Sequence, residues 1–307
     1  MHSARASRGP LSEGHRRLLD VSTGLSGEPA DTLDLELPRR LFRATPSKLA
    51  AYTDCPRRYR ERYVDNRVAP GQAWAHMSLG NSVHLALARW WDEPASERTP
   101  ATAVRLLHRH WVGDGFRDDA QDAATRELAA GWVEGYTATL DPDDAPYAVE
   151  REVAARSATL LFTGRVDRLD ARDGTLAIVD YKTGARGLVD GEARGSSALA
   201  LYAAAAQRML RRTCTRVELH HLPTGEVQVH DHDETALRRA ISRAEAVAAE
   251  AVDAEDAYAD GAAADVAFPP RPGPQCGTCA FRDRCGAGQA AVPEPPPTWA
   301  HLPLEVR

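Results

Sequence analysis

The feature that most constrains the fold is a pair of alternating apolar and polar runs on either side of Asp173-Gly174, in the segment TGRVDRLDARDGTLAIVDYKTG. An Asp-Gly dipeptide between two such runs is a strong signal for a β-hairpin with a tight turn. If the turn has two residues, the register places Asp167 directly across from Asp180. A four-residue loop keeps this register, whereas a three-residue loop or a bulge shifts it.

Alternation with a period of two then places Asp167, Asp180 and Lys182 on one face of the sheet. The other face is expected to carry Val166, Val179 and Tyr181. Two carboxylates directly opposite each other repel, at a cost of up to about 1 kcal/mol. A divalent cation removes this conflict, and oxygen ligands suit Mg²⁺ or Mn²⁺, which can activate water and neutralise charge on a phosphate. Lys182 can orient that water or stabilise developing negative charge; a solvated hairpin face with the same residues is the alternative.

The rest of the chain predicts an α/β domain with a mixed central sheet flanked by helices. Thr45-Pro46 has the form of a helix N-cap followed by proline at the first helical position. Helical spacing predicts helices at residues 49–64 (interrupted by Pro56), 78–91, 101–112, 122–140, 199–212 and 234–258. Strands are expected at residues 148–154, 159–170, 175–182, 216–221 and 226–230, with a Gly-rich loop at 184–195.

Composition divides the chain into three parts. Residues 1–40 are polar and lack periodicity, which predicts a mostly disordered tail, and residues 291–307 predict a Pro-rich, extended tail. The domain between them covers residues 41–290. No apolar run approaches the about 20 residues that span a bilayer, and the N-terminus lacks the apolar core of a secretory signal, so we expect a cytoplasmic protein. The net charge of −6 argues against coating of nucleic acid by bulk electrostatics, but it is compatible with a local basic groove.

Four of the five cysteines form a second pattern. Cys276, Cys279 and Cys285 lie in one short segment, and Cys55 lies far upstream in the sequence. In a reducing compartment this spacing favours metal ligation over disulfides, and four thiolates suit zinc as well as an iron–sulfur cluster. Such a site would tie the two ends of the domain together, whereas four unrelated reduced cysteines are the alternative. Cys214 is left over and is expected to be a buried small residue.

The acidic motifs resemble those of the PD-(D/E)XK nuclease superfamily, over about residues 43–290. The resemblance rests on Asp167 in GRVDRLD and on Asp180 and Lys182 in IVDYKTG. The RecB-like branch, which includes CRISPR-associated relatives, adds a histidine on an upstream helix, matched by His84 in LGNSVHLAL. It also has a tyrosine on the helix after the lysine strand, matched by Tyr202 in LALYAAAA.

This resemblance implies a restriction-endonuclease-like core with helical additions and metal-dependent hydrolysis of DNA phosphodiesters. It implies that His84, Asp167 and Asp180 bind the catalytic metal. The backbone carbonyl of Tyr181 would be a further ligand, and Lys182 would assist the chemistry. In RecB-like nucleases, a cysteine set similar to the one found here holds a [4Fe–4S] cluster, with zinc as the alternative. We expect the activity to be exonuclease-like and to act on single strands or ends.

One departure from the family bears on activity. The family usually has glutamine four residues before the tyrosine, where this chain has Ala198. A catalytically weak or inactive DNA-binding subunit of a repair or recombination complex is therefore one alternative, and a zinc-stapled interaction subunit is another. Glu150 and Glu152 on the preceding strand could offer another carboxylate or could simply be exposed. The chain has no helicase P-loop, so any unwinding would require a partner such as a helicase or repair protein.

Arginines crowd the segment after Cys55, with Tyr59 and Tyr63 between them. They are Arg57, Arg58, Arg60 and Arg62. A basic surface with aromatic rings suits the phosphates and stacked bases of single-stranded DNA. A solvated helix face, partly neutralised by Glu61 and Asp65, is the alternative.

Overall fold

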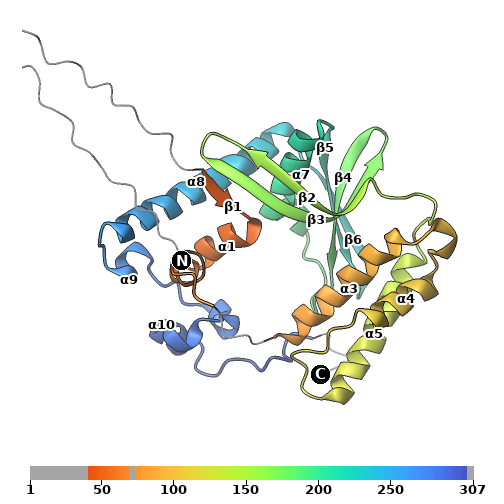
Figure 1. Cartoon of the computed structure of the whole chain (residues 1–307), viewed down its shortest axis with the longest axis horizontal. Helices are drawn as coiled ribbons and strands as arrows, with labels where there is room; N and C mark the ends of the chain where they lie inside the picture. The colour runs from red at the N-terminus through yellow and green to blue at the C-terminus, as the bar shows by residue number, and fades with distance from the viewer. Residues whose placement is uncertain (1–40, 69–72, 303–307) are drawn as a thin grey trace, which may run out of the picture. The chain divides into compact units, whose positions relative to one another are not determined.

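The structure, a computed structural model, describes residues 41–68 and 73–302. The predictions for residues 1–40 and for the last five residues of the Pro-rich segment lie outside this part. Within it, a six-stranded mixed sheet has helices on both faces, as predicted (Figure 1). No helix of the described residues is long and apolar enough to cross a membrane.

The strands follow the order β1-β3-β4-β5-β6, and β2 also pairs with β3. Their bounds are β1 (Phe42–Ala44), β2 (Ala148–Arg156), β3 (Leu160–Arg172), β4 (Thr175–Lys182), β5 (Cys214–His221) and β6 (Glu226–Asp231). The pairs β1–β3 and β4–β5 are parallel, and the others are antiparallel. The turn between β3 and β4 has positive φ at both Asp173 (49°) and Gly174 (80°), as a type I′ hairpin turn requires.

The helices begin and end close to their predicted positions. Thr45 caps the first one, because its side chain accepts a hydrogen bond from Lys48 N at 3.1 Å. The α-helices are α1 (Pro46–Asp54), α2 (Pro56–Tyr59), α3 (Ala75–Asp92), α4 (Pro100–Arg109), α5 (Asp119–Thr137), α6 (Glu192–Gly195), α7 (Ser197–Leu210), α8 (Glu234–Ala259), α9 (Ala264–Ala267) and α10 (Gly286–Ala291). A π-helix η1 (Arg60–Val64) and the 3₁₀ helices η2 (Ala95–Glu97), η3 (Pro274–Thr278) and η4 (Arg282–Arg284) complete the set.

Each face of the sheet buries its own apolar cluster. On one face, α7 and α8 cover Leu176 and Ile178 of β4; on the other, α3, α4 and α5 cover Val179 and Tyr181. Full burial of one such side chain contributes about 1.5–3 kcal/mol. Because β4 contributes to both clusters, the hairpin is held firmly between two helical layers.

The alternation of side chains along β3 is not strict, and here one prediction is wrong. Val166 was expected on the same face as Val179 and Tyr181, but it is buried in the cluster that α7 and α8 cover. The side chains of β3 in that cluster are Leu160, Phe162, Val166 and Leu169. The alternation therefore reverses near Asp167, opposite Glu150 of β2, whose φ is +48°. A non-glycine residue in the left-handed region interrupts the regular pleat, and no residue pattern announces it.

Candidate active site

The β3–β4 hairpin has the predicted two-residue turn and the predicted register. Its pairing ends at Arg168 and Val179, and one step further along the strands Asp167 stands opposite Asp180. At this point a side-chain oxygen replaces a backbone carbonyl as the acceptor: Asp167 Oδ2 accepts a hydrogen bond from Tyr181 N at 2.9 Å. This bond fixes the Asp167 carboxylate at the end of the hairpin.

Glu150 completes a row of three carboxylates on three neighbouring strands. It stands opposite Asp167, because the residues on either side of each are paired between β2 and β3. Asp180 lies on the far side of Asp167, on β4. The φ of +48° at Glu150 costs on the order of 1–3 kcal/mol, and residues held in such conformations cluster at functional sites.

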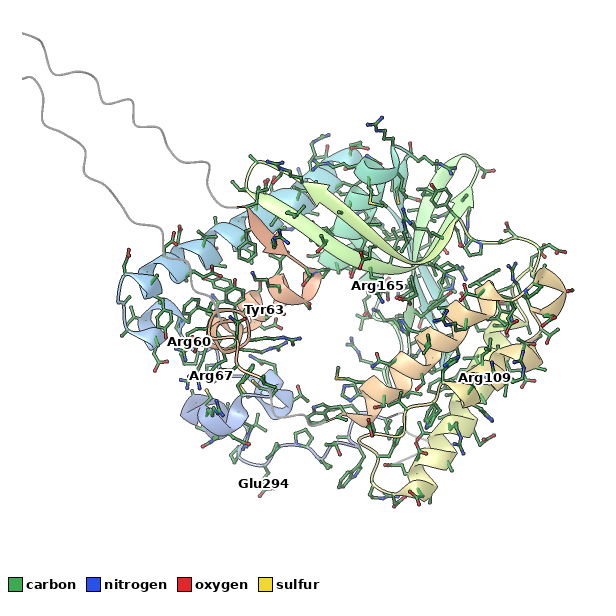
Figure 2. All side chains as sticks on the ribbon, in the orientation of Figure 1. Arg60, Tyr63, Arg67, Arg109, Arg165 and Glu294 are labelled. Carbon is green, nitrogen blue, oxygen red and sulfur yellow. The ribbon has the colours of Figure 1, made fainter. Side chains whose placement is uncertain are left out.

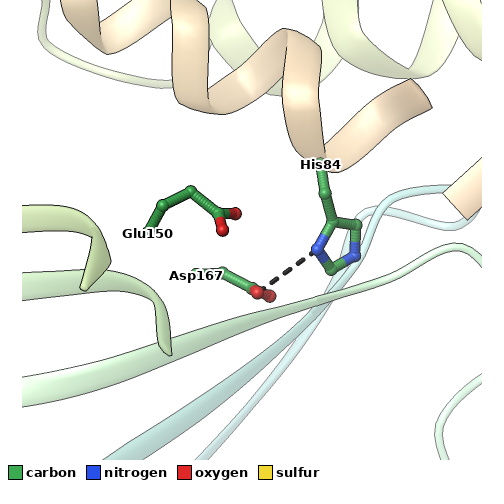
Figure 3. A group of neighbouring side chains, drawn as sticks. All are labelled: His84, Glu150 and Asp167. Atoms are coloured by element: carbon green, nitrogen blue, oxygen red, sulfur yellow. Dashed lines mark ion pairs between the residues drawn. The ribbon is translucent and has the colours of Figure 1, made fainter. Parts of the chain in front are cut away.

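His84 of α3 lies over this row. Its Nδ1 is 3.3 Å from Asp167 Oδ1, and its Nε2 is 3.1 Å from the carbonyl oxygen of Tyr181. Gly80 lets α3 approach, since a Cβ at that position would lie only 3.3 Å from Thr183 Oγ1. Ligand atoms of His84, Glu150 and Asp167 all lie within 4.8 Å of one another (Figure 3). Imidazole nitrogen and carboxylate oxygen are both ligands for divalent metals, so these residues fit such an ion.

The protonation of these groups is shifted by burial and by negative charge. Burial lowers the pKa of His84, but the hydrogen bond and charge of Asp167, together with the charges of Asp180 and Glu150, raise it above its ordinary value. Burial and the charge of Asp167 raise the pKa of Glu150. Burial also raises the pKa of Asp180, against the effect of Lys182. The shifts share one cause, an excess of negative charge in a partly buried place, and a divalent cation would offset it.

Asp180 and Lys182 are set apart from the group under His84. Lys182 Nζ lies 2.6 Å from Asp180 Oδ2. The structure thus brings His84, Asp167 and the Tyr181 carbonyl together, and it places Glu150, rather than Asp180, within the same 4.8 Å group. The lysine side chain is 42% exposed and can reach a molecule bound beside the carboxylates.

Tyr202 of α7 approaches the carboxylates from the opposite face of the sheet. Burial and the charges of Asp180 and Asp167 raise its pKa to about 12. Gly164 makes this position possible, because a Cβ there would overlap Cε1 of the tyrosine ring. Tyr202 is therefore a protonated hydroxyl near the acidic row at neutral pH.

A cleft of about 780 Å³ opens beside the group. Its lining includes Met77 and Leu85 of α3, which are 56% and 37% exposed, and Arg165 of β3. Arg165 is 62% exposed and lies 3.6 Å from Glu150, on the side of the sheet that faces α3 (Figure 2). Sequence reasoning missed Arg165 and gave Glu150 little importance; the only available signal was the alignment of Glu150 with Asp167, which needs the β2–β3 register.

Comparison with known proteins decides the family. A family model described as the PD-(D/E)XK nuclease superfamily matches residues 43–286. The chain belongs to the PD-(D/E)XK nuclease superfamily. Its mixed sheet with flanking helices is accordingly a restriction-endonuclease-like core, as predicted.

Two solved structures are similar to this superfamily member at low sequence identity. Among curated proteins none matches. A candidate exonuclease from Eubacterium rectale, solved by crystallography, shares 9% identity at a TM-score of 0.45, covering 76% of this chain and 88% of its own. A second crystal structure, that of SSO0001, shares 12% identity at a TM-score of 0.37, covering 81% of this chain and 88% of its own. Similarities at this level carry no argument about activity.

The four cysteines of the predicted metal site line one small cavity in this PD-(D/E)XK protein. Cys55, Cys276, Cys279 and Cys285 surround a volume of about 30 Å³. Gly288 lies against two of them, since a Cβ there would be 3.5 Å from Cys285 Sγ and 3.6 Å from Cys276 Sγ. Its N–H donates to Cys285 Sγ at 3.3 Å.

These four thiols fit either a zinc ion or an iron–sulfur cluster, since both accept four thiolate ligands. The fifth cysteine, Cys214, is fully buried elsewhere, as predicted, and burial raises its pKa to about 12.

Arg60 departs from the predicted DNA-binding surface. Its side chain is buried, with 6% exposed, and its guanidinium lies 3.2 Å from Glu61 and 3.4 Å from Asp65 (Figure 2). Glu61 and Asp65, which were expected to neutralise the arginines in part, form ion pairs with this buried arginine. Arg60 therefore stabilises the fold and is not part of an exposed basic surface.

The other three predicted arginines divide between two surroundings. Arg57 donates to the carbonyl oxygen of Arg284 at 2.7 Å, and Arg58 lines the cysteine cavity. Arg62 is exposed and packs its guanidinium 5.4 Å from the centre of the Tyr63 ring. Of the four, Arg62 is exposed, Arg57 and Arg58 are half-buried, and Arg60 is buried.

Proposed function

We propose that this protein is a RecB-like, metal-dependent deoxyribonuclease that hydrolyses phosphodiester bonds in single strands or at DNA ends, as an exonuclease of the cytoplasm. The observation that carries the proposal is the row formed by Glu150, Asp167 and Asp180, with His84 above it and Lys182 beside it. Carboxylates side by side repel one another, and the convergence of Glu150 and Asp167 on one imidazole is best explained by a divalent cation.

The residues that would hold Mg²⁺ or Mn²⁺ are His84, Glu150, Asp167 and the backbone carbonyl of Tyr181. Asp180 would join them when Lys182 releases it. When bound, the ion would supply a nucleophilic water and stabilise charge on the phosphate. Asp167 also positions the ligand carbonyl, because it accepts the hydrogen bond of Tyr181 N and so fixes that peptide group.

Three cations and a hydroxyl of the chain would act on phosphates of the substrate. Lys182, tethered to Asp180, would place its ammonium against charge that develops on the attacked phosphate. Arg165 would contact a neighbouring phosphate from β3, and Arg62 would add a further one at the surface. Tyr202, protonated at neutral pH, would donate a hydrogen bond from the α7 side.

The cleft beside the site supports single-stranded DNA as the substrate. Its α3 wall exposes the apolar side chains of Met77 and Leu85, and its β3 wall carries Arg165. Apolar surface suits unstacked bases and an arginine suits phosphates, whereas a paired duplex buries its base faces. Because the chain has no P-loop, a helicase or repair partner would supply unwinding.

For the cysteines we propose a [4Fe–4S] cluster with a structural role. The four thiols line one cavity and can together hold such a cluster, and a single zinc ion is the alternative. Backbone N–H groups of Gly288 and Arg271 donate to Cys285 Sγ and Cys55 Sγ, and hydrogen bonds of this kind tune cluster thiolates. Loss of the metal group would loosen both ends of the domain.

A second function is a weak or inactive DNA-binding subunit of a repair or recombination complex. It is favoured by Ala198, which stands where the family usually has glutamine, in the first turn of α7. This form would bind DNA but would not cleave it.

The test is cleavage of end-labelled single-stranded DNA in Mg²⁺ or Mn²⁺, with protein purified anaerobically. Wild type is compared with Asp180→Ala and Lys182→Ala, and Glu152→Gln is the control, since its side chain is 83% exposed on a neighbouring strand. We expect cleavage by wild type and the control, and loss in both site variants. If folded, metal-loaded wild type binds DNA but does not cleave it, the nuclease proposal is wrong and the DNA-binding subunit is favoured.

A further inference from the structure

The Pro-rich segment behind the last cysteine connects the cysteine cavity to the helix that carries His84. Residues 292–302, here called the C-terminal strut, run from the end of α10 to the N-terminal end of α3 (Figure 1). Pro293 and Pro295–Pro297 form its middle. Proline-rich chain is stiff and extended, with about 3.1 Å per residue, so it can hold two attached points at a fixed separation.

The first end of the strut is clamped to the cysteine segment. Arg282, which lines the cysteine cavity, donates from Nη2 to the carbonyl oxygens of Val292 and Pro293, both at 2.7 Å. Pro296 packs against Gly277, which lies between Cys276 and Cys279 in the sequence. A Cβ on Gly277 would lie 3.0 Å from Pro296 Cδ. A shift of the cysteine loops therefore moves this end of the strut.

The second end is fastened to α3. The carbonyl of Thr298 accepts a hydrogen bond from Ala75 N at 3.1 Å, and this N–H begins a helix whose N-cap residue makes no side-chain cap. The rings of His301 and His76 meet edge to face at 5.7 Å. Leu302 is fully buried in the cluster of α3, α4 and α5. The strut thus supplies the missing cap of α3 and an apolar anchor beside it.

We propose that the strut couples the two sites: when the cysteines hold their metal group, the strut fixes the N-terminal end of α3 and thereby positions His84 against Asp167 and the Tyr181 carbonyl. His84 lies about two and a half turns beyond Ala75 on the same continuous helix, so a shift at the helix start is transmitted to the imidazole. The strut residues are positioning residues, because they touch neither the carboxylates nor the cleft. The proposal rests on the proposed function only in treating His84 as a metal ligand. The coupling between the cysteine site and the order of α3 does not depend on it.

The test is a double-variant cycle with two readouts. One substitution, Cys279→Ser, removes a cysteine ligand. The other replaces Pro295 and Pro297 by Gly, which keeps Pro296 against Gly277 and so both fastened ends, but reduces the stiffness between them. Amide hydrogen exchange over residues 77–84 reports the order of α3, and titration with Mn²⁺, followed by electron paramagnetic resonance of the free ion, reports the affinity of the site at His84.

In the wild-type background we expect Cys279→Ser to speed exchange in α3 and to weaken Mn²⁺ binding about tenfold, the size of effect seen for residues that orient metal ligands. In the flexible-strut background, Cys279→Ser should change both readouts less than twofold. Unchanged α3 exchange in Cys279→Ser, or an equal effect in both backgrounds, would overturn the proposal.

Truncations provide matched controls. A chain that ends after Leu302 keeps the strut and should match wild type. A chain that ends after Pro293 keeps both acceptors of Arg282 but loses the Thr298 cap and Leu302, so its α3 should exchange faster than in wild type, and Cys279→Ser should change that exchange less than twofold. If Cys279→Ser speeds exchange in α3 but wild type does not bind Mn²⁺, the proposed metal site is wrong and the role of the strut is supported. If wild type binds Mn²⁺ but Cys279→Ser does not change exchange in α3, the role of the strut is wrong and the metal site is unaffected.

Discussion

Replacement of Glu150 by glutamine should have opposite effects on stability with and without a divalent cation. Without the ion, the carboxylate stands opposite Asp167, and the raised pKa of Glu150 shows that burial and this neighbour disfavour its charge despite Arg165. Removal of one of two facing like charges should stabilise the protein by up to about 1 kcal/mol. For a domain of this size, that raises the melting temperature by about 2–4 °C.

With the ion, the same substitution removes a ligand. We take the loss of affinity as about 100-fold, the upper end of the effect of residues that merely orient ligands. At Mn²⁺ one hundred times above the wild-type dissociation constant, wild type gains about 2.7 kcal/mol from binding, and the variant gains about 0.4 kcal/mol. Wild type should then be the more stable protein by about 1 kcal/mol, so the order of stabilities reverses.

The assay is thermal unfolding of wild type, Glu150→Gln and Glu152→Gln, each in chelator and in Mn²⁺ at one hundred times the wild-type dissociation constant. Glu152 is the matched control, because it lies on the same strand near the same arginine but outside the group within 4.8 Å of His84. The control should respond to Mn²⁺ as wild type does. A Glu150→Gln protein that is stabilised by Mn²⁺ as strongly as wild type would refute the assignment of Glu150 as a ligand.

Three further predictions follow from packing and charge. Gly164→Ala should destabilise the protein by about 1–3 kcal/mol in urea unfolding, because its Cβ overlaps an aromatic ring, whereas Gly131→Ala in α5 meets no atom within 4 Å and should be neutral or stabilising. Arg60→Ala should cost about 1–3 kcal/mol, since it removes the buried partner of Glu61 and Asp65 and leaves them only the half-exposed Arg67. Arg62→Ala should leave stability unchanged and weaken binding of single-stranded DNA at low salt. Burial opposes the ionised form of Glu218, but a hydrogen bond with His220 and nearby arginines outweigh it and lower the pKa of Glu218. Its stabilisation is therefore present above the ordinary pKa of about 4.3 and is lost as pH falls through the depressed value, so the stability gap to Glu218→Gln should shrink between about pH 5 and about pH 3.

The hairpin could be predicted from sequence because local chemistry determines it. Asp173-Gly174 accepts positive φ at both positions, so the turn length and the register that aligns Asp167 with Asp180 follow from the dipeptide. The helix starts were equally local, as the Thr45 cap shows. The grouping of the cysteines was also accessible, because close spacing of three thiols predicts a common site.

Other features depend on contacts between distant segments. The place of Glu150 needs the β2–β3 register and a left-handed residue within a strand, which propensity disfavours. β1 has three residues, too few for an alternating pattern, and is defined by its parallel pairing with β3. The burial of Arg60 depends on how η1 packs, and a composition-based reading of the Pro-rich segment gave no sign that Leu302 would be buried beside α3.

The carboxylates under His84 are expected to bind a divalent cation. Anomalous diffraction from crystals soaked in Mn²⁺ tests this binding most directly. We predict a manganese peak bounded by His84, Glu150 and Asp167, and its loss in Asp167→Asn crystals of the same form. Manganese bound elsewhere, with no density among these three side chains at a concentration that saturates the protein in solution, would contradict it.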